Sequence, residues 1–153
     1  MDTVVIRPYI STDYGDVSRI HDAARKLELS FAGLDEAFLP FSVAAEREDF
    51  FAYPHIDVAV LNDRVVGFSA YTGEELAWLY VSADQLRKKI GSALVQNALC
   101  VEPDLCEIEV LLGNEPAKRL YEKFDFRIER IAKGVMPGNE SFPVEVYCMH
   151  RMG

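Results

Sequence analysis

The chain has 153 residues, half of them hydrophobic and about a quarter charged, which is typical of one soluble globular domain. Sixteen basic and twenty-five acidic residues give a formal net charge of −9. This charge argues against a nucleic-acid binder, which needs a basic face to displace phosphate counterions. No apolar run reaches the roughly 18 residues that span a bilayer, and the N-terminus lacks a secretory signal pattern. We therefore expect a single cytoplasmic domain over residues 1–153, with no nucleic-acid or membrane partner. The acidic charge serves either solubility or attraction of a cationic substrate.

The cysteines and histidines show no spacing that is typical of a metal site. There is no C-x-x-C pair and no H-E-x-x-H motif, so the sequence predicts free thiols and no bound metal. The residues concerned are Cys100, Cys106, Cys148, His21, His55 and His150.

Hydrophobic periodicity divides the first half of the chain into strands and helices. Val17, Ile20, Ala24 and Leu27 recur at helical spacing, which predicts an amphipathic helix over residues 12–29. A second helix is predicted over 42–52, with Ser42 as its N-cap, after an irregular apolar stretch over 30–41. Strands are predicted over 3–9, 55–61, 65–72 and 75–82, with residues 62–64 as the turn of a hairpin.

The second half continues this alternation. An apolar stripe predicts a helix over 90–101, and another predicts a helix over 114–124. Strands are expected over 106–112, 126–131 and 144–151, with a Gly- and Pro-rich loop over 132–143. The resulting order, β-α-α-β-β-β-α-β-α-β-β, predicts an α/β (mixed α+β) fold with a twisted, mixed sheet of about seven strands and helices on both faces.

A basic segment precedes the helix at 90–101. Arg87, Lys88 and Lys89 form the densest basic cluster of an acidic chain, and the helix opens near Gly91. Free backbone N–H groups and the positive end of a helix dipole favour a bound phosphate or pyrophosphate at such a junction. The simpler interpretation is a solvated basic loop before an ordinary helix. The segment matches neither the P-loop nor the dinucleotide-binding fingerprint.

The helix predicted at 114–124 carries a second polar pattern. Asn114 suits an N-cap, and Pro116 suits the first turn. Asn114 and Tyr121 are seven residues apart, which places them on one helix face, roughly 10 Å apart along the axis. An extended ligand lying along that face would meet both side chains.

These two segments resemble the GNAT superfamily of N-acetyltransferases. The Q/R-x-x-G-x-G/A motif of that family corresponds to Leu86 through Gly91, followed by a helix. The motif N-x-x-A-x-x-[LF]-Y-x-x-x-G-F corresponds to Asn114 through Phe126. Leu86 stands where the family has Gln or Arg, and Lys89 and Asp125 stand where it has glycines.

The resemblance implies that acetyl-CoA binds between two splayed parallel strands, here 76–82 and 106–112. By analogy, strand backbone groups would pair with the pantetheine, the basic loop would hold the pyrophosphate, and Tyr121 would lie near the thiol. The implied acetyl-CoA-binding residues are Leu79, Tyr80, Val81, Arg87, Lys88, Lys89, Ile90, Gly91, Ser92, Asn114 and Tyr121.

The resemblance also implies roles in catalysis. An ammonium acceptor must lose a proton before it attacks, and Glu75 and Glu109 are the two candidate bases. A strand N–H near Leu79 or Tyr80 would stabilise the oxyanion, and the Tyr121 phenol would protonate the departing thiolate. The simpler interpretations are solvent-facing glutamates and a core tyrosine. Family analogy places the acceptor site in residues 25–53, whose aromatic side chains line a pocket or belong to the core.

The sequence therefore predicts an acetyl-CoA-dependent N-acetyltransferase that acts on a primary amine of a small molecule or peptide by direct attack. One alternative is a degenerate GNAT domain that binds CoA or another ligand without turnover, suggested by Leu86 and Lys89. Another is a regulatory module that works as a homodimer, in which the strand 144–151 offers a free edge to a partner.

Overall fold

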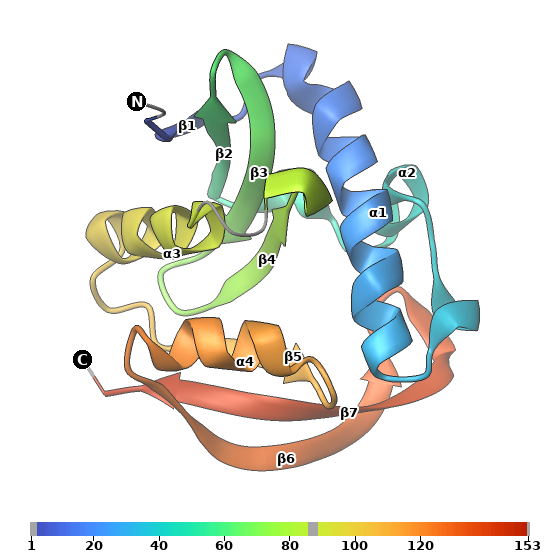
Figure 1. Cartoon of the computed structure of the whole chain (residues 1–153). Coiled ribbons are helices and arrows are strands. Elements are labelled where there is room, and N and C mark those ends of the chain that lie inside the picture. The colour runs from blue at the N-terminus through green and yellow to red at the C-terminus, as the bar shows by residue number, and fades with distance from the viewer. Residues whose placement is uncertain (1–2, 86–88, 153) are drawn as a thin grey trace.

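The fold follows the predicted order of strands and helices (Figure 1). The computed structural model describes residues 3–85 and 89–152. Its elements are β1 (Val5–Pro8), α1 (Tyr14–Phe31), α2 (Phe41–Arg47), β2 (His55–Leu61), β3 (Arg64–Tyr71), β4 (Leu76–Val81), α3 (Ile90–Val101), β5 (Glu107–Leu111), α4 (Glu115–Glu122), β6 (Phe126–Met136) and β7 (Asn139–Arg151).

The seven strands form two antiparallel sheets instead of one continuous sheet. The first has the order β1-β2-β3-β4, and the second has the order β5-β7-β6. They meet at a parallel bridge between Glu75 and Glu107, at the start of β4 and β5. Beyond this bridge, the two parallel strands belong to different sheets, which leaves one edge of β4 without a neighbouring strand in the described part of the chain. This arrangement agrees with the predicted pair of splayed parallel strands.

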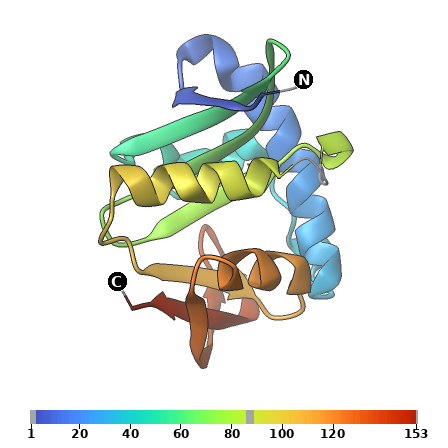
Figure 2. The same ribbon diagram turned by 60° about the vertical axis from the view of Figure 1, so that its left-hand side comes forward.

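Helices cover both faces of the first sheet, as predicted (Figures 1 and 2). On the α1–α2 side, Val17, Phe41 and Phe50 pack against Phe68 and Trp78 in one buried cluster. Phe41 and Phe50 are therefore core residues. On the opposite side, α3 buries Ile90 and Leu94 against β2 and β3, while α4 packs on the second sheet.

The start of α1 is set by an ion pair with β1. The Asp13 carboxylate accepts two hydrogen bonds from the Arg7 guanidinium, at 2.8 and 3.0 Å, and one from the Ile10 N–H at 2.9 Å. Chiefly through the hydrogen bond from Arg7, the pKa of the buried Asp13 is lowered. The helix begins two residues later than predicted because a 3₁₀ turn occupies residues 11–13.

The prediction for α2 was wrong at both ends. Pro40, not Ser42, is the N-cap, and the Phe41 N–H donates to the Asp22 carboxylate of α1 at 2.8 Å. The helix ends at Arg47 instead of residue 52 because Asp49 adopts a left-handed backbone, with φ of 52°. The cap comes from another helix, so local sequence rules could not identify it.

The hairpin between β2 and β3 is confirmed. Asn62 and Asp63 have φ angles of 51° and 61°, the left-handed pair that a tight two-residue hairpin turn requires. Asn and Asp tolerate this conformation better than other non-glycine residues.

The predicted loop over 132–143 is wrong, because most of it is strand. β6 continues to Met136, β7 begins at Asn139, and Pro137–Gly138 makes the turn. Gly138 has φ of 73°, and Pro143 lies opposite Val135 in the ladder. β7 is moreover the central strand of its sheet, so the segment 144–151 has no free edge to offer a partner. The outer edge of this sheet is β6.

The described residues contain neither a membrane-spanning helix nor a cluster of metal ligands. Within 3–85 and 89–152, no helix has the length and apolar character needed to cross a membrane. The same residues contain no group of three or more His, Cys, Asp or Glu side chains placed to hold a metal ion.

Candidate active site

A cavity of about 590 Å³ lies where the two sheets meet. Its walls come from α1, α2, β4, β5 and the β6–β7 hairpin. His21, Arg25 and Glu28 face it from α1, because spacings of four and three residues place them on one side of the helix. Glu75 and Glu109 line it from the strands.

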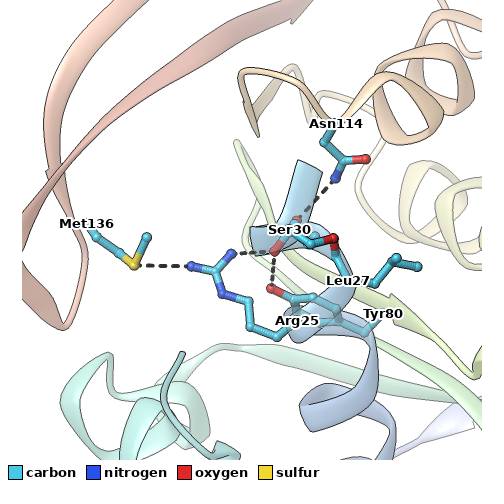
Figure 3. Close-up of polar contacts among 7 residues, drawn as sticks. Arg25, Leu27, Ser30, Tyr80, Asn114 and Met136 are labelled. Carbon is cyan, nitrogen blue, oxygen red and sulfur yellow. Dashed lines mark hydrogen bonds and ion pairs between the residues drawn. The ribbon is translucent and has the colours of Figure 1, made fainter. Parts of the chain in front are cut away.

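A polar network centred on Glu28 joins three walls of this region. Figure 3 labels its other members, Arg25, Tyr80, Asn114 and Met136. Glu28 pairs with Arg25 one turn earlier, accepts from the Tyr80 hydroxyl at 3.1 Å, and accepts from the Asn114 amide at 3.4 Å. The Arg25 guanidinium also contacts the Met136 sulfur of the hairpin, at 3.5 Å. Burial, followed by the charge of Glu28, raises the pKa of the Tyr80 phenol, which therefore stays protonated.

His21 is a neutral, oriented imidazole in the same wall. It is buried among the rings of Phe41, Trp78 and Tyr80, at centroid distances of 5.2 to 5.8 Å. Burial lowers the pKa of His21, although Asp22, 3.0 Å from Nδ1, opposes this effect. A carboxylate accepts only, so Nδ1 donates to Asp22 and Nε2 is left as the acceptor.

The carboxylates at the junction of β4 and β5 are close enough to interact. Glu75 is half-buried beside the parallel bridge to Glu107, while Glu109 is exposed. Burial raises the pKa of Glu75, and the charges of Glu109 and Glu107 raise it further. The Glu75 carboxylate is therefore more basic than that of an ordinary glutamate.

A fourth carboxylate, Glu48, lies in the cavity wall next to the hairpin turn. A β-carbon on Gly138 would come within 3.1 Å of Glu48 Cγ, and Arg47 donates to the Gly138 carbonyl at 2.9 Å. Burial raises the pKa of Glu48 to about 7; Arg25 opposes this shift, and Glu140 and Glu28 add to it. Burial of this carboxylate thus moves its titration toward physiological pH.

The open edge of β4 presents backbone groups toward the gap between the strands. The Ser82 N–H donates to the Val66 carbonyl at 2.8 Å, so alternation along the ladder turns the N–H and C=O of Leu79 and Val81 away from β3. The Tyr80 backbone faces β3, and its side chain faces the cavity. A bulge at Ala77 interrupts the β3–β4 register in the cavity wall.

The predicted phosphate-binding loop is described in part. Arg87 and Lys88 lie outside the described residues, whereas Lys89 is the N-cap of α3, with φ of 60° and ψ of 28°. Lys89 and Asp125, with φ of 70°, both adopt the left-handed backbone that favours glycine, and both stand at glycine positions of the family motifs.

The first turn of α3 contributes mainly backbone and small side chains. Ile90 is buried in the core, and Ser92 is half-buried. A β-carbon on Gly91 would lie 3.0 Å from Leu120 Cδ2, so Gly91 allows α3 to approach α4 closely. Substitution of Gly91 would therefore disturb helix packing as well as any ligand.

Asn114 and Tyr121 share the buried face of α4, as their spacing predicts. The Asn114 side chain caps the helix, accepting from the Ala117 N–H at 3.4 Å. The Tyr121 ring packs at 6.3 Å from Phe126 in the core and does not line the cavity. Burial, followed by the charge of Glu28, raises the pKa of Tyr121 well above its usual range.

The structure thus brings Glu75, Glu109 and Tyr80 to one cavity and places Asn114 beside its Glu28 network. Sequence analysis missed the roles of Arg25 and Glu48. The helical spacing of His21, Arg25 and Glu28 was a usable signal for α1, whereas the position of Glu48 depends on a distant hairpin.

The amino-acid sequence matches one family model. The model described as "Acetyltransferase (GNAT) domain" matches residues 47–128, which include β4, α3, β5 and α4. No curated protein matches the sequence significantly.

Several solved structures share the fold over nearly the whole chain. The apo form of YjaB from Escherichia coli has a TM-score of 0.74 at 22% identity, over 99% of both chains. A GCN5-related N-acetyltransferase from Rhodopseudomonas palustris has a TM-score of 0.77 at 19% identity, over 99% of this chain and 96% of that one. PaiA N-acetyltransferase from Thermoplasma acidophilum, in complex with coenzyme A, has a TM-score of 0.67 at 16% identity, over 99% of both chains. At these identities the likeness shows a common fold.

Proposed function

Because the chain belongs to the acetyltransferase (GNAT) family, we propose that it transfers an acetyl group from acetyl-CoA to a primary amine. The observation that carries this proposal is the gap between β4 and β5, which meets an acidic cavity at Glu75. The gap suits an extended thioester, and the cavity suits an acceptor that reaches it from the α1 side.

The described residues fit acetyl-CoA. The outward N–H and C=O groups of Leu79 and Val81 are available to the amides of a pantetheine arm. The N-terminus of α3, which begins at Ile90, favours the negative charge of a pyrophosphate. Lys89, whose side chain is exposed there, adds a positive charge.

Glu75 is the base that the surroundings favour. The acceptor enters as an ammonium, and a carboxylate takes one proton from it most effectively when its pKa is close to the working pH. Glu75 is half-buried with a raised pKa, whereas Glu109 is exposed on the next strand. Glu109 remains the alternative base, reached directly or through water.

The transfer itself conserves atoms and charge. The free amine forms a C–N bond to the acetyl carbon, and a backbone N–H near Leu79 stabilises the resulting oxyanion. The C–S bond then breaks, the thiolate takes a proton from Tyr121, and the second proton that the nitrogen releases restores the Tyr121 phenol. The raised pKa of Tyr121 keeps the phenol protonated until that step. The products are an amide, free CoA and one proton.

Tyr121→Phe tests this assignment. We expect turnover, measured as free-thiol release, to fall by roughly a hundredfold, because a general acid is lost. Acetyl-CoA affinity, measured by calorimetry, should change little because the ring is kept. Tyr147→Phe is the matched control, since Tyr147 packs at the edge of the same cluster. Equal turnover in Tyr121→Phe and the parent would exclude the catalytic role.

The pair Glu75→Gln and Glu109→Gln distinguishes the two bases. We expect the larger loss of turnover for Glu75→Gln, and we expect that variant to lose the acidic limb of the pH–rate profile. A larger loss for Glu109→Gln would assign the base to β5. Thiol release that is absent with every amine, despite tight acetyl-CoA binding, would support the alternative of a binding domain without turnover.

A further inference from the structure

The charges in the cavity wall do not balance. Three half-buried carboxylates, Glu28, Glu48 and Glu75, face one half-buried guanidinium, Arg25. This leaves two formal negative charges in the wall. Carboxylates removed from water are stable only when they are paired or protonated. The other charged side chains of the wall are exposed to solvent: Arg47, Glu109 and Lys133.

Arg25 is committed to Glu28. The two side chains form an ion pair, and the same carboxylate accepts from Tyr80 and Asn114. Of the exposed cations, Arg47 donates to the Gly138 carbonyl and Lys133 pairs with Glu145 at 3.7 Å. Within the described part of the chain, Glu48 and Glu75 have no ion-pair partner.

These two carboxylates lie in different parts of the cavity wall. Glu75 lies at the junction of the two sheets, and its interacting charges are Glu109 and Glu107. Glu48 lies by the hairpin turn, and its interacting charges are Arg25, Glu140 and Glu28. Tyr53 lines the same cavity: burial raises the pKa of its phenol, and the charges of Glu75 and Glu48 both add to the shift.

We propose that the acceptor is a linear amine that carries a second cationic group, with the reacting nitrogen at Glu75 and the distal ammonium at Glu48. This inference rests on the proposed transferase function. Tyr53, Trp78 and Tyr80 supply aromatic surface in the same cavity wall. Such rings suit the apolar methylene chain of a diamine and attract its cations.

The same charge balance disfavours an amino acid as acceptor. A carboxylate on the acceptor would need a cation inside the cavity, and Arg25 is already paired with Glu28. It would also lie near the carboxylates of Glu48 and Glu75, where like charges repel.

Calorimetric titration tests the inference without requiring turnover. The probes are 1,4-diaminobutane and 1-aminobutane, which share one chain length and differ by one cation, each titrated with CoA present. We expect the diamine to bind at least about tenfold tighter than the monoamine, as expected for one partly buried charge pair. Glu48→Gln should abolish that difference. Glu46→Gln, which removes an exposed charge from the same helix, should preserve it.

The outcomes separate this inference from the proposed function. Equal affinities for the two probes, no binding of either, or an equal loss in both variants would overturn the dicationic acceptor. Preferential diamine binding without thiol release would overturn the transferase activity while supporting the dicationic site. Thiol release that is equally efficient with both probes, as kcat/KM, would support the transferase and overturn the acceptor class.

Discussion

Glu48 is expected to destabilise the folded protein above neutral pH in the absence of ligand. Its pKa rises from 4.5 to about 7 on folding, chiefly through burial. The folded state therefore holds a proton that the unfolded state releases between these pH values. The contribution of Glu48 to the free energy of unfolding must then fall as pH rises through this window, and it is lowest above pH 7.

Glu48→Gln removes this effect, because glutamine is neutral at every pH. The full shift would correspond to roughly 3 kcal/mol at about 1.4 kcal/mol per pKa unit. Glu48 is only half-buried, so screening by solvent reduces the expected gain to about 1–2 kcal/mol at pH 8. The gain should be only about half as large at pH 5.5. At that pH the wild-type carboxyl is still protonated in the folded state, so no charge is buried.

Urea denaturation of the parent, Glu48→Gln and Glu46→Gln at pH 5.5 and pH 8 measures the effect. The gain in free energy of unfolding from Glu48→Gln should grow by about 0.5–1 kcal/mol between the two pH values. Glu46 is exposed on the same helix, so Glu46→Gln controls for the loss of one charge from an acidic protein. An advantage of Glu48→Gln that stays constant with pH, or that Glu46→Gln reproduces, would refute the argument from burial.

Two further substitutions test the local structure by the same measurement. Asp13→Ala should lower the free energy of unfolding by about 2 kcal/mol, because it leaves the Arg7 guanidinium and the Ile10 N–H without their partner. The control Asp16→Ala should lower it much less, because the ion pair of Asp16 with Arg19 is exposed. The lowered pKa of Asp13 means that this contribution is present above pH 4 and disappears as pH falls through the folded pKa, so a loss that persists at low pH would contradict it. Lys89→Gly should raise the free energy of unfolding by up to about 1 kcal/mol by relieving a left-handed backbone, whereas Lys89→Ala keeps the β-carbon and should not. Equal effects of the two Lys89 substitutions would contradict the strain.

Much of the fold could be predicted because it depends on local patterns. The bounds of α3 and β2 agree with prediction to the residue, since apolar periodicity and turn chemistry operate within a few residues. The Asn62-Asp63 turn and the Asn114 cap are equally local. The positions that depart from the family motifs, Lys89 and Asp125, keep the backbone conformation that glycine would favour.

The errors occurred where distant segments decide the structure. The cap of α2 comes from Asp22, which lies 19 residues before Phe41 and accepts a hydrogen bond from its N–H. The segment 132–143 contains the glycines and prolines of a loop, yet most of it is strand because the end of β6 pairs with the start of β7. Strand pairing compensates for weak local propensity, and that compensation is not visible within the segment itself.

The sequence by itself determined the order of elements, because short-range sterics and hydrophobic periodicity fix each element. The splayed strands and most candidate groups along them were expected only from the resemblance to the GNAT family. The tertiary structure alone decided which charges share a cavity. Hydrogen bonds across 91, 102 and 111 residues attach the β6–β7 hairpin to Arg47, Ala37 and Arg25. This attachment closes a wall that half-buries Glu48, and burial of a carboxylate depends on whatever folds over it, wherever that segment lies in the chain.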